Sequence, residues 1–467
     1  MDARPVDVVV IGGGIAGLAA AYELQQRGRA VRVLEASGRP GGVIRTERTD
    51  GWVIDGGPDS LLVQKAAAVA LCRELGLGDR LVPTLQPRTA FVLRRGQLHA
   101  IAEGSFLGFP ITLGALMRSR LFTVLGKIRM AREVLVPRRD GTDDESIASF
   151  VRRRFGTEAV DYLADPLLAG IHAGDAERLS MRALFPRLVE AERRSGSVIR
   201  ALRSLRVTPS PQGAFVSLPG GTGELVDALA AALAPGTVLY GAAVTTVRRD
   251  TLFEVAFTDG RIRAGSVILA VPAYVASTVV RDLDPTLADL CGAVRYASTA
   301  TVVFGYRRDQ VAHPLRGTGF VVPRTEGRAL LAGTWISSKW PGRAPAGHVL
   351  IRGFLGGGRD PHRLDDADEV LIDTARRELA DLLGIEGPPC LTRLFRWTRQ
   401  SPQYDVGHLE RMTAIERRLT ALPGVLVTGS GFRAIGIPDC IADGRSMGAS
   451  AAAHVAGPDA KAETEAS

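Results

Sequence analysis

The stretch Val6–Gly17, which reads VDVVVIGGGIAG, decides the fold. It begins as a short apolar run typical of a buried strand, and Ile15–Gln26 follows with the apolar spacing of a helix. Val31–Leu34 is a second strand. Strand, helix and strand in this order predict an α/β fold built on a parallel sheet.

Three glycines of this stretch match the GxGxxG pattern of dinucleotide sites. Gly12 allows a tight turn, Gly14 lets the backbone approach a pyrophosphate, and Gly17 allows close helix packing. The free N–H groups and the dipole of the helix start would then face the diphosphate. Glu35 ends the second strand and can accept hydrogen bonds from ribose hydroxyls, which disfavours NADP. A glycine-rich turn with a purely structural role is the alternative.

Two further segments favour FAD over NAD. Gly41–Thr46, GGVIRT, adds flexible backbone and Arg45 near the phosphates. Near the other end of the chain, Gly429 precedes Gly436-Ile437-Pro438-Asp439, which predicts a helix with proline in its first turn. Such a helix start could stabilise an anionic reduced flavin, although Pro438 could also be a plain helix starter.

Bulk properties exclude several other classes of protein. The 467 residues suggest two or three domains. The four cysteines form no CxxC pair and the seven histidines form no metal motif, so we expect neither disulfides nor a metal site. Pro235-Gly236 and Pro272 interrupt the longest uncharged stretches, which argues against a transmembrane helix. No signal peptide is evident at the N-terminus, and we expect a cytoplasmic protein.

The net charge of +8 is concentrated in one region. Pro87–Arg139 contains ten basic and two acidic residues, and within it Ile111–Val136 predicts a basic amphipathic helix, or a pair of helices broken near Gly126. This stretch could bind a membrane surface, steer an acidic substrate or form a solvated face. It lacks interleaved stacking aromatics, so nucleic-acid binding is not expected.

Longer segments resemble one flavoenzyme family. The N-terminal motifs are similar to the FAD superfamily of monoamine oxidases, phytoene desaturases and protoporphyrinogen oxidases. Asp165–Asp175 (DPLLAGIHAGD), Pro402–Arg411 (PQYDVGHLER) and Gly436–Ile441 (GIPDCI) resemble the porphyrinogen oxidase branch alone. The resemblance covers essentially the whole chain in order.

The resemblance implies a discontinuous Rossmann-like FAD-binding domain with two insertions, a mixed α+β substrate domain and a helical domain that could face a membrane. We expect residues 1–87, 218–284 and 423–467 to form the FAD-binding domain. Residues 88–91, 203–217 and 285–422 would form the substrate domain, and residues 92–202 the helical domain.

Site residues follow by position or by resemblance. The residues expected to bind the cofactor are Gly12, Gly13, Gly14, Ile15, Ala16, Gly17, Glu35, Ala36, Gly42, Arg45, Gly57, Pro58, Asp59, Ser60, Val244, Trp397, Gly429, Gly436, Ile437 and Pro438. Trp397 could equally be plain core. The residues expected in the substrate pocket are Gly170, Ile171, Val321, Trp335, Lys339, Arg352 and Phe354, with the two cations as propionate contacts.

The family's chemistry moves a hydride from a methylene bridge of a porphyrinogen to the flavin, and O₂ then reoxidises the flavin and gives H₂O₂. No catalytic side chain is expected, because positioning against the flavin suffices. Ala90 stands where plant and animal protoporphyrinogen oxidases carry an Arg, and Gly108–Thr112, Ser298–Thr301 and Thr318–Val322 resemble bacterial coproporphyrinogen III oxidases. We therefore favour coproporphyrinogen III over protoporphyrinogen IX.

Two other classes of function stay open. A flavin amine oxidase would need an aromatic cage, for which Trp335, Trp340 and Trp397 are candidates. A non-catalytic flavin-binding partner of a membrane complex is supported by the basic stretch alone. The expected partners are the porphyrinogen, O₂, the inner face of the cell membrane as a peripheral surface and a second copy in a homodimer.

Overall fold

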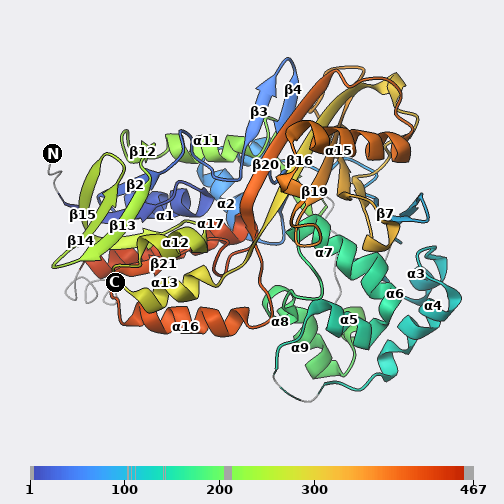
Figure 1. The fold of residues 1–467 in the computed structure, drawn as a ribbon, viewed down its shortest axis with the longest axis horizontal. Helices are drawn as coiled ribbons and strands as arrows, with labels where there is room; N and C mark the ends of the chain where they lie inside the picture. The colour runs from blue at the N-terminus through green and yellow to red at the C-terminus, as the bar shows by residue number, and fades with distance from the viewer. Residues whose placement is uncertain are drawn as a thin grey trace.

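The computed structural model describes residues 5–102, 105–106, 108–110, 112–139, 141, 143–204 and 213–456. Residues 205–212, within the segment 203–217 expected in the substrate domain, and the tail at 457–467 lie outside this range, as does Ile111. In Figure 1 a first sheet with its helices lies on the left, a second sheet lies at the upper right, and a group of helices lies at the lower right.

The first sheet has seven strands drawn from distant parts of the chain. Its parallel strands are β12, β2, β1, β15 and β21: Val238–Tyr240, Val31–Glu35, Val6–Ile11, Gly260–Leu269 and Val425–Val427. The antiparallel strands β13 (Val244–Arg249) and β14 (Phe253–Phe257) extend it beyond β15. The N-terminal strand is therefore central, and it pairs with β15 through residues 258 positions later, such as Val10 with Ile268.

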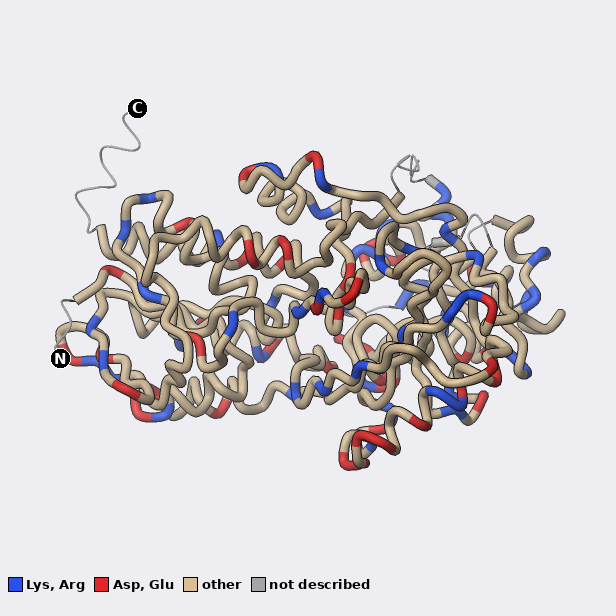
Figure 2. Tube along the Cα trace, turned by 90° about the horizontal axis from the view of Figure 1, so that it is seen from above, with Lys and Arg blue, Asp and Glu red and all other residues tan. Residues whose placement is uncertain are grey.

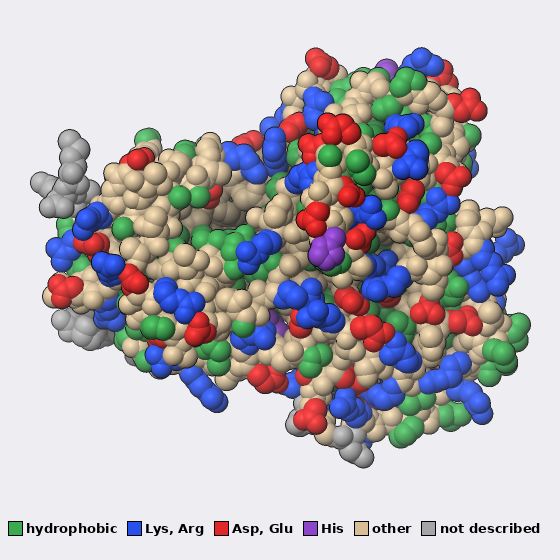
Figure 3. Space-filling model, in the orientation of Figure 1, with side chains coloured by type: hydrophobic (Ala, Val, Ile, Leu, Met, Phe, Trp, Pro, Cys, Tyr) green, Lys and Arg blue, Asp and Glu red, His purple; other side chains and the backbone are tan. Residues whose placement is uncertain are grey.

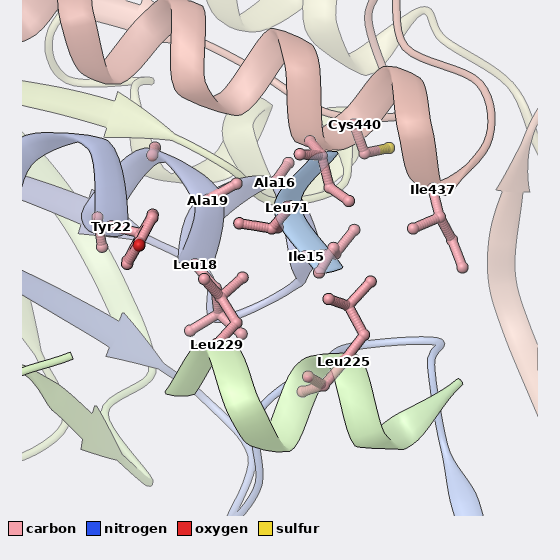
Figure 4. Close-up of a cluster of buried hydrophobic side chains, with 14 of the residues drawn as sticks. Ile15, Ala16, Leu18, Ala19, Tyr22, Leu71, Leu225, Leu229, Ile437 and Cys440 are labelled. Carbon is pink, nitrogen blue, oxygen red and sulfur yellow. The ribbon is translucent and has the colours of Figure 1, made fainter. Parts of the chain in front are cut away.

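Four helices pack on one face of this sheet: α1 (Ile15–Gln26), α2 (Ala66–Glu74), α11 (Gly223–Ala231) and α17 (Ile437–Val455). Figure 4 shows side chains from all four meeting in one hydrophobic cluster. A Cβ on Gly444 would lie 2.2 Å from the carbonyl oxygen of Ala16, so α17 packs directly on the backbone of α1.

The second sheet also has seven strands, in the order β20-β16-β19-β18-β17-β7-β8. These strands are Leu391–Pro402, Tyr296–Arg307, His348–Gly356, Leu330–Trp335, Gly319–Val321, Ala90–Arg94 and Gln97–Ala100. Helix α15 (Asp368–Leu383) covers one face through an apolar stripe that includes Leu371, Ala375 and Leu379, all of which are fully buried.

The helical group contains α3 (Leu113–Arg118), α4 (Val124–Ala131), α5 (Ile147–Phe155), α6 (Thr157–Ala159), α7 (Asp165–His172), α8 (Met181–Leu184), α9 (Pro186–Ser195) and α10 (Val198–Ser204). The predicted basic helix is thus a pair, but it breaks at residues 119–123 instead of near Gly126. Thr123 caps α4 by accepting a hydrogen bond from the N–H of Gly126, which places that glycine inside the helix.

The sequence also predicts a helix over Leu61–Leu75, which ends at the C-cap glycine Gly76. This prediction is wrong in part: the helix, α2, begins only at Ala66, because Leu61–Leu62 pairs as the short strand β5 with β11 (Phe215–Ser217). The remaining helices and strands are β3 Thr46–Thr49, β4 Trp52–Asp55, β6 Val82–Pro83, β9 Ser105–Phe106, β10 Phe109–Pro110, α12 Ala273–Val279, α13 Pro285–Gly292, α14 Ile336–Lys339 and α16 His408–Thr420.

Among the described residues, no helix combines the length and the apolar character needed to cross a membrane. Within the same part of the chain, no three His, Cys, Asp or Glu side chains are grouped so as to hold a metal ion.

Candidate active site

The glycine loop between β1 and α1 has the geometry of a phosphate cradle. Gly12 has a φ of 105°, and a Cβ there would lie 2.5 Å from the carbonyl oxygen of Ala270. A Cβ on Gly17 would lie 2.0 Å from the carbonyl oxygen of Gly12. By contrast, a Cβ on Gly14 would meet nothing within 4 Å. The outer two glycines are therefore needed for packing, and the middle one faces open space in which a diphosphate fits.

The carboxylate of Glu35 is fixed beside this loop. It accepts hydrogen bonds from the N–H of Gly13 at 2.6 Å and from the N–H of Ser37 at 2.8 Å. The N–H of Gly41 donates to the carbonyl of Gly13 at 2.8 Å, and Gly42 lies against Gly14. Ala36 follows at the end of β2. These residues thus form one continuous rim at the carboxyl end of the parallel strands, where dinucleotides bind in such sheets.

The start of α17 lies close to this rim. Gly429 lies against Ala16, with 3.5 Å between the Ala16 methyl carbon and the position of a Cβ on the glycine. Gly436 precedes α17 with a φ of 94°, and no side chain caps the helix that Ile437 and Pro438 begin. The first turns of α1 and α17 therefore present N–H groups from opposite ends of the sequence to one region, as FAD binding requires.

The loop at residues 56–60 is held by a buried ion cluster, which we call the loop cluster: Asp59, Lys339 and Arg352. Lys339 Nζ lies 2.9 and 3.1 Å from the two Asp59 oxygens, and Arg352 Nη2 lies 3.0 Å from Oδ2. Burial would raise the pKa of the Asp59 carboxyl, but the two cations outweigh it and hold that pKa well below its usual range. Ser60 Oγ and Trp340 Nε1 also donate to this carboxylate.

Arg352 also fixes the backbone of the same loop. Its Nη1 donates to the carbonyls of Asp55 and Gly57, at 2.9 Å each. Lys339 and Arg352, expected as propionate contacts, thus lie against the loop that resemblance assigns to the flavin. Phe354, expected as a pocket wall, has the Arg352 guanidinium 4.8 Å from its ring centroid.

Trp397 packs against this loop as well. Its indole Nε1 donates to the carbonyl of Gly56 at 2.9 Å, and its ring lies 3.8 Å from the position of a Cβ on Gly57. The carbonyl of Pro58 accepts from Thr222 Oγ1 at 2.8 Å. Other expected cofactor residues lie further apart: Arg45 Nη2 is bonded to Glu47 at 2.8 Å, and Val244 begins β13 opposite Phe257.

A cavity of about 570 Å³ opens between the helical group and the start of α17. Most of its wall is apolar and comes from α5, α7, α8 and α10 with the neighbouring segments. Its polar and charged side chains are Lys65, His172, Tyr404, Arg433 and Asp439. A mostly apolar cavity with a few polar groups is typical of a small-molecule site.

The cavity matches the predicted pocket only in part. Ile171 lines it. Gly170 lies beside it in α7, where a Cβ would be 3.2 Å from Val321 Cγ1. Trp335 is fully buried in the core of the second sheet, with its ring centroid 4.8 Å from that of His313. Trp340 is fully buried too, so these two tryptophans form no open aromatic cage.

Sequence reasoning did not single out three cavity residues. His172 and Tyr404 stand inside the motifs DPLLAGIHAGD and PQYDVGHLER, so their motifs were found but not their roles. Lys65 belongs to no motif. It is placed by an ion pair of 2.5 Å with Asp439 in the first turn of α17, a contact between residues 374 positions apart.

The sequence pattern of the family described as flavin containing amine oxidoreductase matches residues 15–452. The chain belongs to this family of flavin enzymes, and its cofactor is FAD, as the glycine loop and the second helix start predicted.

Within that family, the similar curated proteins are porphyrinogen oxidases. The coproporphyrinogen III oxidase of Bacillus subtilis (strain 168) is 34% identical over 94% of this chain and 96% of its own length. That of Staphylococcus aureus (strain NCTC 8325 / PS 47) is 31% identical over 94% and 97%. The chloroplastic protoporphyrinogen oxidase of Nicotiana tabacum is 28% identical over 94% and 84%.

Solved structures agree with this assignment. A protein from Exiguobacterium sp. 255-15, provisionally described as a protoporphyrinogen oxidase, has a TM-score of 0.86 at 31% identity, over 97% of this chain and all of the other. The cyclohexylamine oxidase of Brevibacterium oxydans IH-35A has a TM-score of 0.72 at 18% identity, over 97% of this chain and all of the other, which shows the shared fold alone.

Proposed function

We propose that this flavoenzyme oxidises coproporphyrinogen III to coproporphyrin III in haem biosynthesis, with O₂ as the final acceptor and H₂O₂ as its product. The observation that carries the proposal is the 570 Å³ apolar cavity that ends at the first turn of α17, where the cofactor would lie. The whole-length similarity to coproporphyrinogen III oxidases supports the same substrate.

The residues of the cavity would bind the macrocycle and exclude water from it. Apolar side chains such as Phe150, Leu167 and Leu168 would contact the pyrrole faces. Lys65 lines the cavity and pairs with Asp439 in the first turn of α17, and it would meet a carboxylate of the substrate. When bound, the flavin supplies a two-electron acceptor.

The choice between two porphyrinogens is tested directly. Purified enzyme is given coproporphyrinogen III and protoporphyrinogen IX in separate aerobic assays, and porphyrin fluorescence is followed. We expect kcat/KM to favour coproporphyrinogen III by about tenfold or more, equivalent to about 1.4 kcal/mol. Equal values, or a preference for protoporphyrinogen IX, would overturn the choice and leave the second substrate as the better proposal.

We also propose that the chain divides into the three domains expected from the sequence, with one change of boundary: β7 and β8 belong to the second sheet and not to the helical domain. We propose further that the helical domain touches a membrane surface. Large apolar side chains stand exposed on α3, α4 and the turn after them, with Leu125 77% and Leu135 73% exposed. Figure 3 shows hydrophobic and basic side chains mixed over this lower right part of the molecule, and Figure 2 shows Lys and Arg at the same end. An exposed apolar patch with basic neighbours suits an anionic bilayer.

A further inference from the structure

One polar side chain of the cavity differs from the other four. Lys65 pairs with Asp439, Tyr404 Oη donates to the carbonyl of Ser430 at 2.9 Å, and Arg433 Nε donates to Asp443 at 2.7 Å. The imidazole of His172 lines the same cavity, and it has no hydrogen-bond partner among the residues that the structure describes. His172 is half-buried, so its ring nitrogens are open to a ligand that enters the cavity.

The backbone of His172 is fixed from two sides. It is the last residue of α7, and its carbonyl accepts a hydrogen bond from Gln403 Nε2 at 3.1 Å. Ala173 ends the helix with a φ of 51°, and its carbonyl accepts from the N–H of Gly358 at 2.7 Å. Leu168, one helical turn earlier, lines the same cavity, so this face of α7 is turned to the ligand.

The imidazole is neutral at physiological pH. Burial and then the charge of Lys65 lower the pKa of His172 to about 4. The other charged or titratable groups of the cavity wall are Asp439 from α17, Tyr404 from the segment after β20 and Arg433 from the loop before α17. A neutral imidazole offers one acceptor nitrogen, which can take a hydrogen bond or a proton.

We propose that His172 accepts a pyrrole N–H of the bound porphyrinogen and removes its proton during each oxidation. This inference rests on the proposed function, and it adds a side-chain base where the sequence suggested that none was needed. In each round a C–H bond of a methylene bridge breaks and its electron pair leaves as hydride to the flavin. The pyrrole N–H bond breaks as well, its electron pair enters the new double bond, and the proton goes to the imidazole. His172 returns the proton to water before the next round. After the third round one proton moves from the remaining methylene bridge to a pyrrole nitrogen, which leaves the porphyrin with two N–H groups.

The experiment separates the two half-reactions in three proteins: the wild type, His172→Phe and His172→Gln. Each is mixed with coproporphyrinogen III without oxygen, and bleaching of the flavin is followed by stopped flow. We expect bleaching to slow by about 10²-fold or more in both variants, which is the usual effect of losing a general base. Flavin reduced with dithionite should react with O₂ at the wild-type rate in all three.

Chemical rescue tests the role without relying on the variant's rate alone. Imidazoles of increasing basicity, added to His172→Ala, should restore bleaching in order of their pKa, which a purely structural role would not produce.

Binding of the product coproporphyrin, measured by fluorescence quenching, should weaken by about two- to tenfold in His172→Phe and less in His172→Gln, because glutamine keeps an acceptor. The matched control is His362→Gln, a histidine whose side chain is 89% exposed.

Two failures can be told apart. Bleaching of His172→Phe at the wild-type rate, or rescue that ignores basicity, would overturn the role of His172 and leave the proposed function standing. A wild-type enzyme that holds FAD but is bleached by neither porphyrinogen would overturn both. Should His172→Phe not fold, His172→Gln and the rescue series in His172→Ala give the same decision.

Discussion

Two buried carboxylates of this molecule, Glu133 and Asp59, both pair with buried cations, but their partners lie at very different distances along the sequence. Glu133 is fully buried and accepts from Arg154, from Ser197 Oγ and from the N–H of Val198, all within 65 residues along the chain; we call these groups the helical cluster. Asp59, in the loop cluster, takes its cations from positions 280 and 293 residues later. One cluster joins a helical region to itself, and the other joins the loop at residues 56–60, which resemblance assigns to the flavin, to α14 and to β19 of the second sheet. Loss of the first should therefore affect stability alone, and loss of the second should also affect the cofactor.

The largest expected effect is on stability, from Glu133→Ala. Arg154, fully buried, would keep only Glu192 at 3.3 Å as a counter-ion, and Ser197 Oγ and the N–H of Val198 would lose their acceptor. We expect a loss of about 3–5 kcal/mol in the free energy of unfolding. Urea titration measures it. The control is Glu190→Ala, which removes an exposed i,i+4 pair with Arg194 and should cost about 0.5 kcal/mol or less. The fraction of Glu133→Ala that stays folded should bind FAD as tightly as the wild type does. Weaker FAD binding would contradict the proposed difference between the two clusters.

Asp59→Asn should change both properties. Lys339 and Arg352 would lose their shared anion while staying buried, and we expect a loss of about 3 kcal/mol in stability. The loop at residues 56–60 should also shift, because Arg352 holds the carbonyl of Gly57 within it and that of Asp55 just before it. The measurements are FAD retention on gel filtration and the visible circular dichroism of the flavin.

The control for this variant is Asp227→Asn, an exposed aspartate that pairs weakly with Arg48 at 3.5 Å. It should retain wild-type stability and flavin spectra. If Asp59→Asn loses stability but leaves flavin binding and its spectrum untouched, the two clusters do not differ in the way proposed here.

Acid should destabilise the protein through a third buried group. His408 stacks on Tyr404 at 3.7 Å, its Nε2 lies 2.7 Å from the carbonyl of Phe432, and burial lowers its pKa to about 4. Its pKa in the unfolded chain is about 6.5, so the unfolded state takes up the proton first. Stability is fully present above about pH 6.5 and falls as the pH drops toward 4, by at most about 3 kcal/mol for this group.

Urea titrations at pH 7 and pH 4.5 measure this slope in the wild type and in His408→Gln. The variant should lose less stability on acidification, by about 2 kcal/mol, while His362→Gln should behave as the wild type. His172 contributes in the same direction, so part of the slope should remain. Identical slopes in the wild type and His408→Gln would contradict the assignment.

The smallest expected effect on stability comes from the exposed apolar residues of α4. Leu125→Ser with Ile128→Ser should change the free energy of unfolding by about 0.5 kcal/mol or less, because both side chains face solvent. Cosedimentation with anionic vesicles should fall several-fold if this surface binds bilayers. Val370→Ser, an exposed apolar residue of α15, is the control. Equal sedimentation of all three proteins would refute the membrane proposal.

Local sequence predicted the glycine loop and both helix starts well. Val6–Ile11 and Ile15–Gln26 have the predicted bounds, and α17 begins one residue before Pro438. These elements depend on turn glycines and apolar spacing, which a short window contains. The roles of Lys339, Arg352 and Lys65 were not predictable in this way. Their partners lie roughly 300 residues away in sequence, so only the folded chain reveals that Asp59 and Asp439 hold them.

The close packing of α17 on α1 has a consequence for synthesis. Gly444 and Gly448 of α17 cover the carbonyls of Ala16 and Ala20. The first helix to be synthesised, α1, is therefore fully packed only after α17 has been made. Until residues 437–455 emerge, the nascent chain lacks one of the two helix starts that are expected to bind the nucleotide. We therefore expect FAD to bind only late in synthesis, and a nascent chain stalled before residue 437 should not bind the flavin.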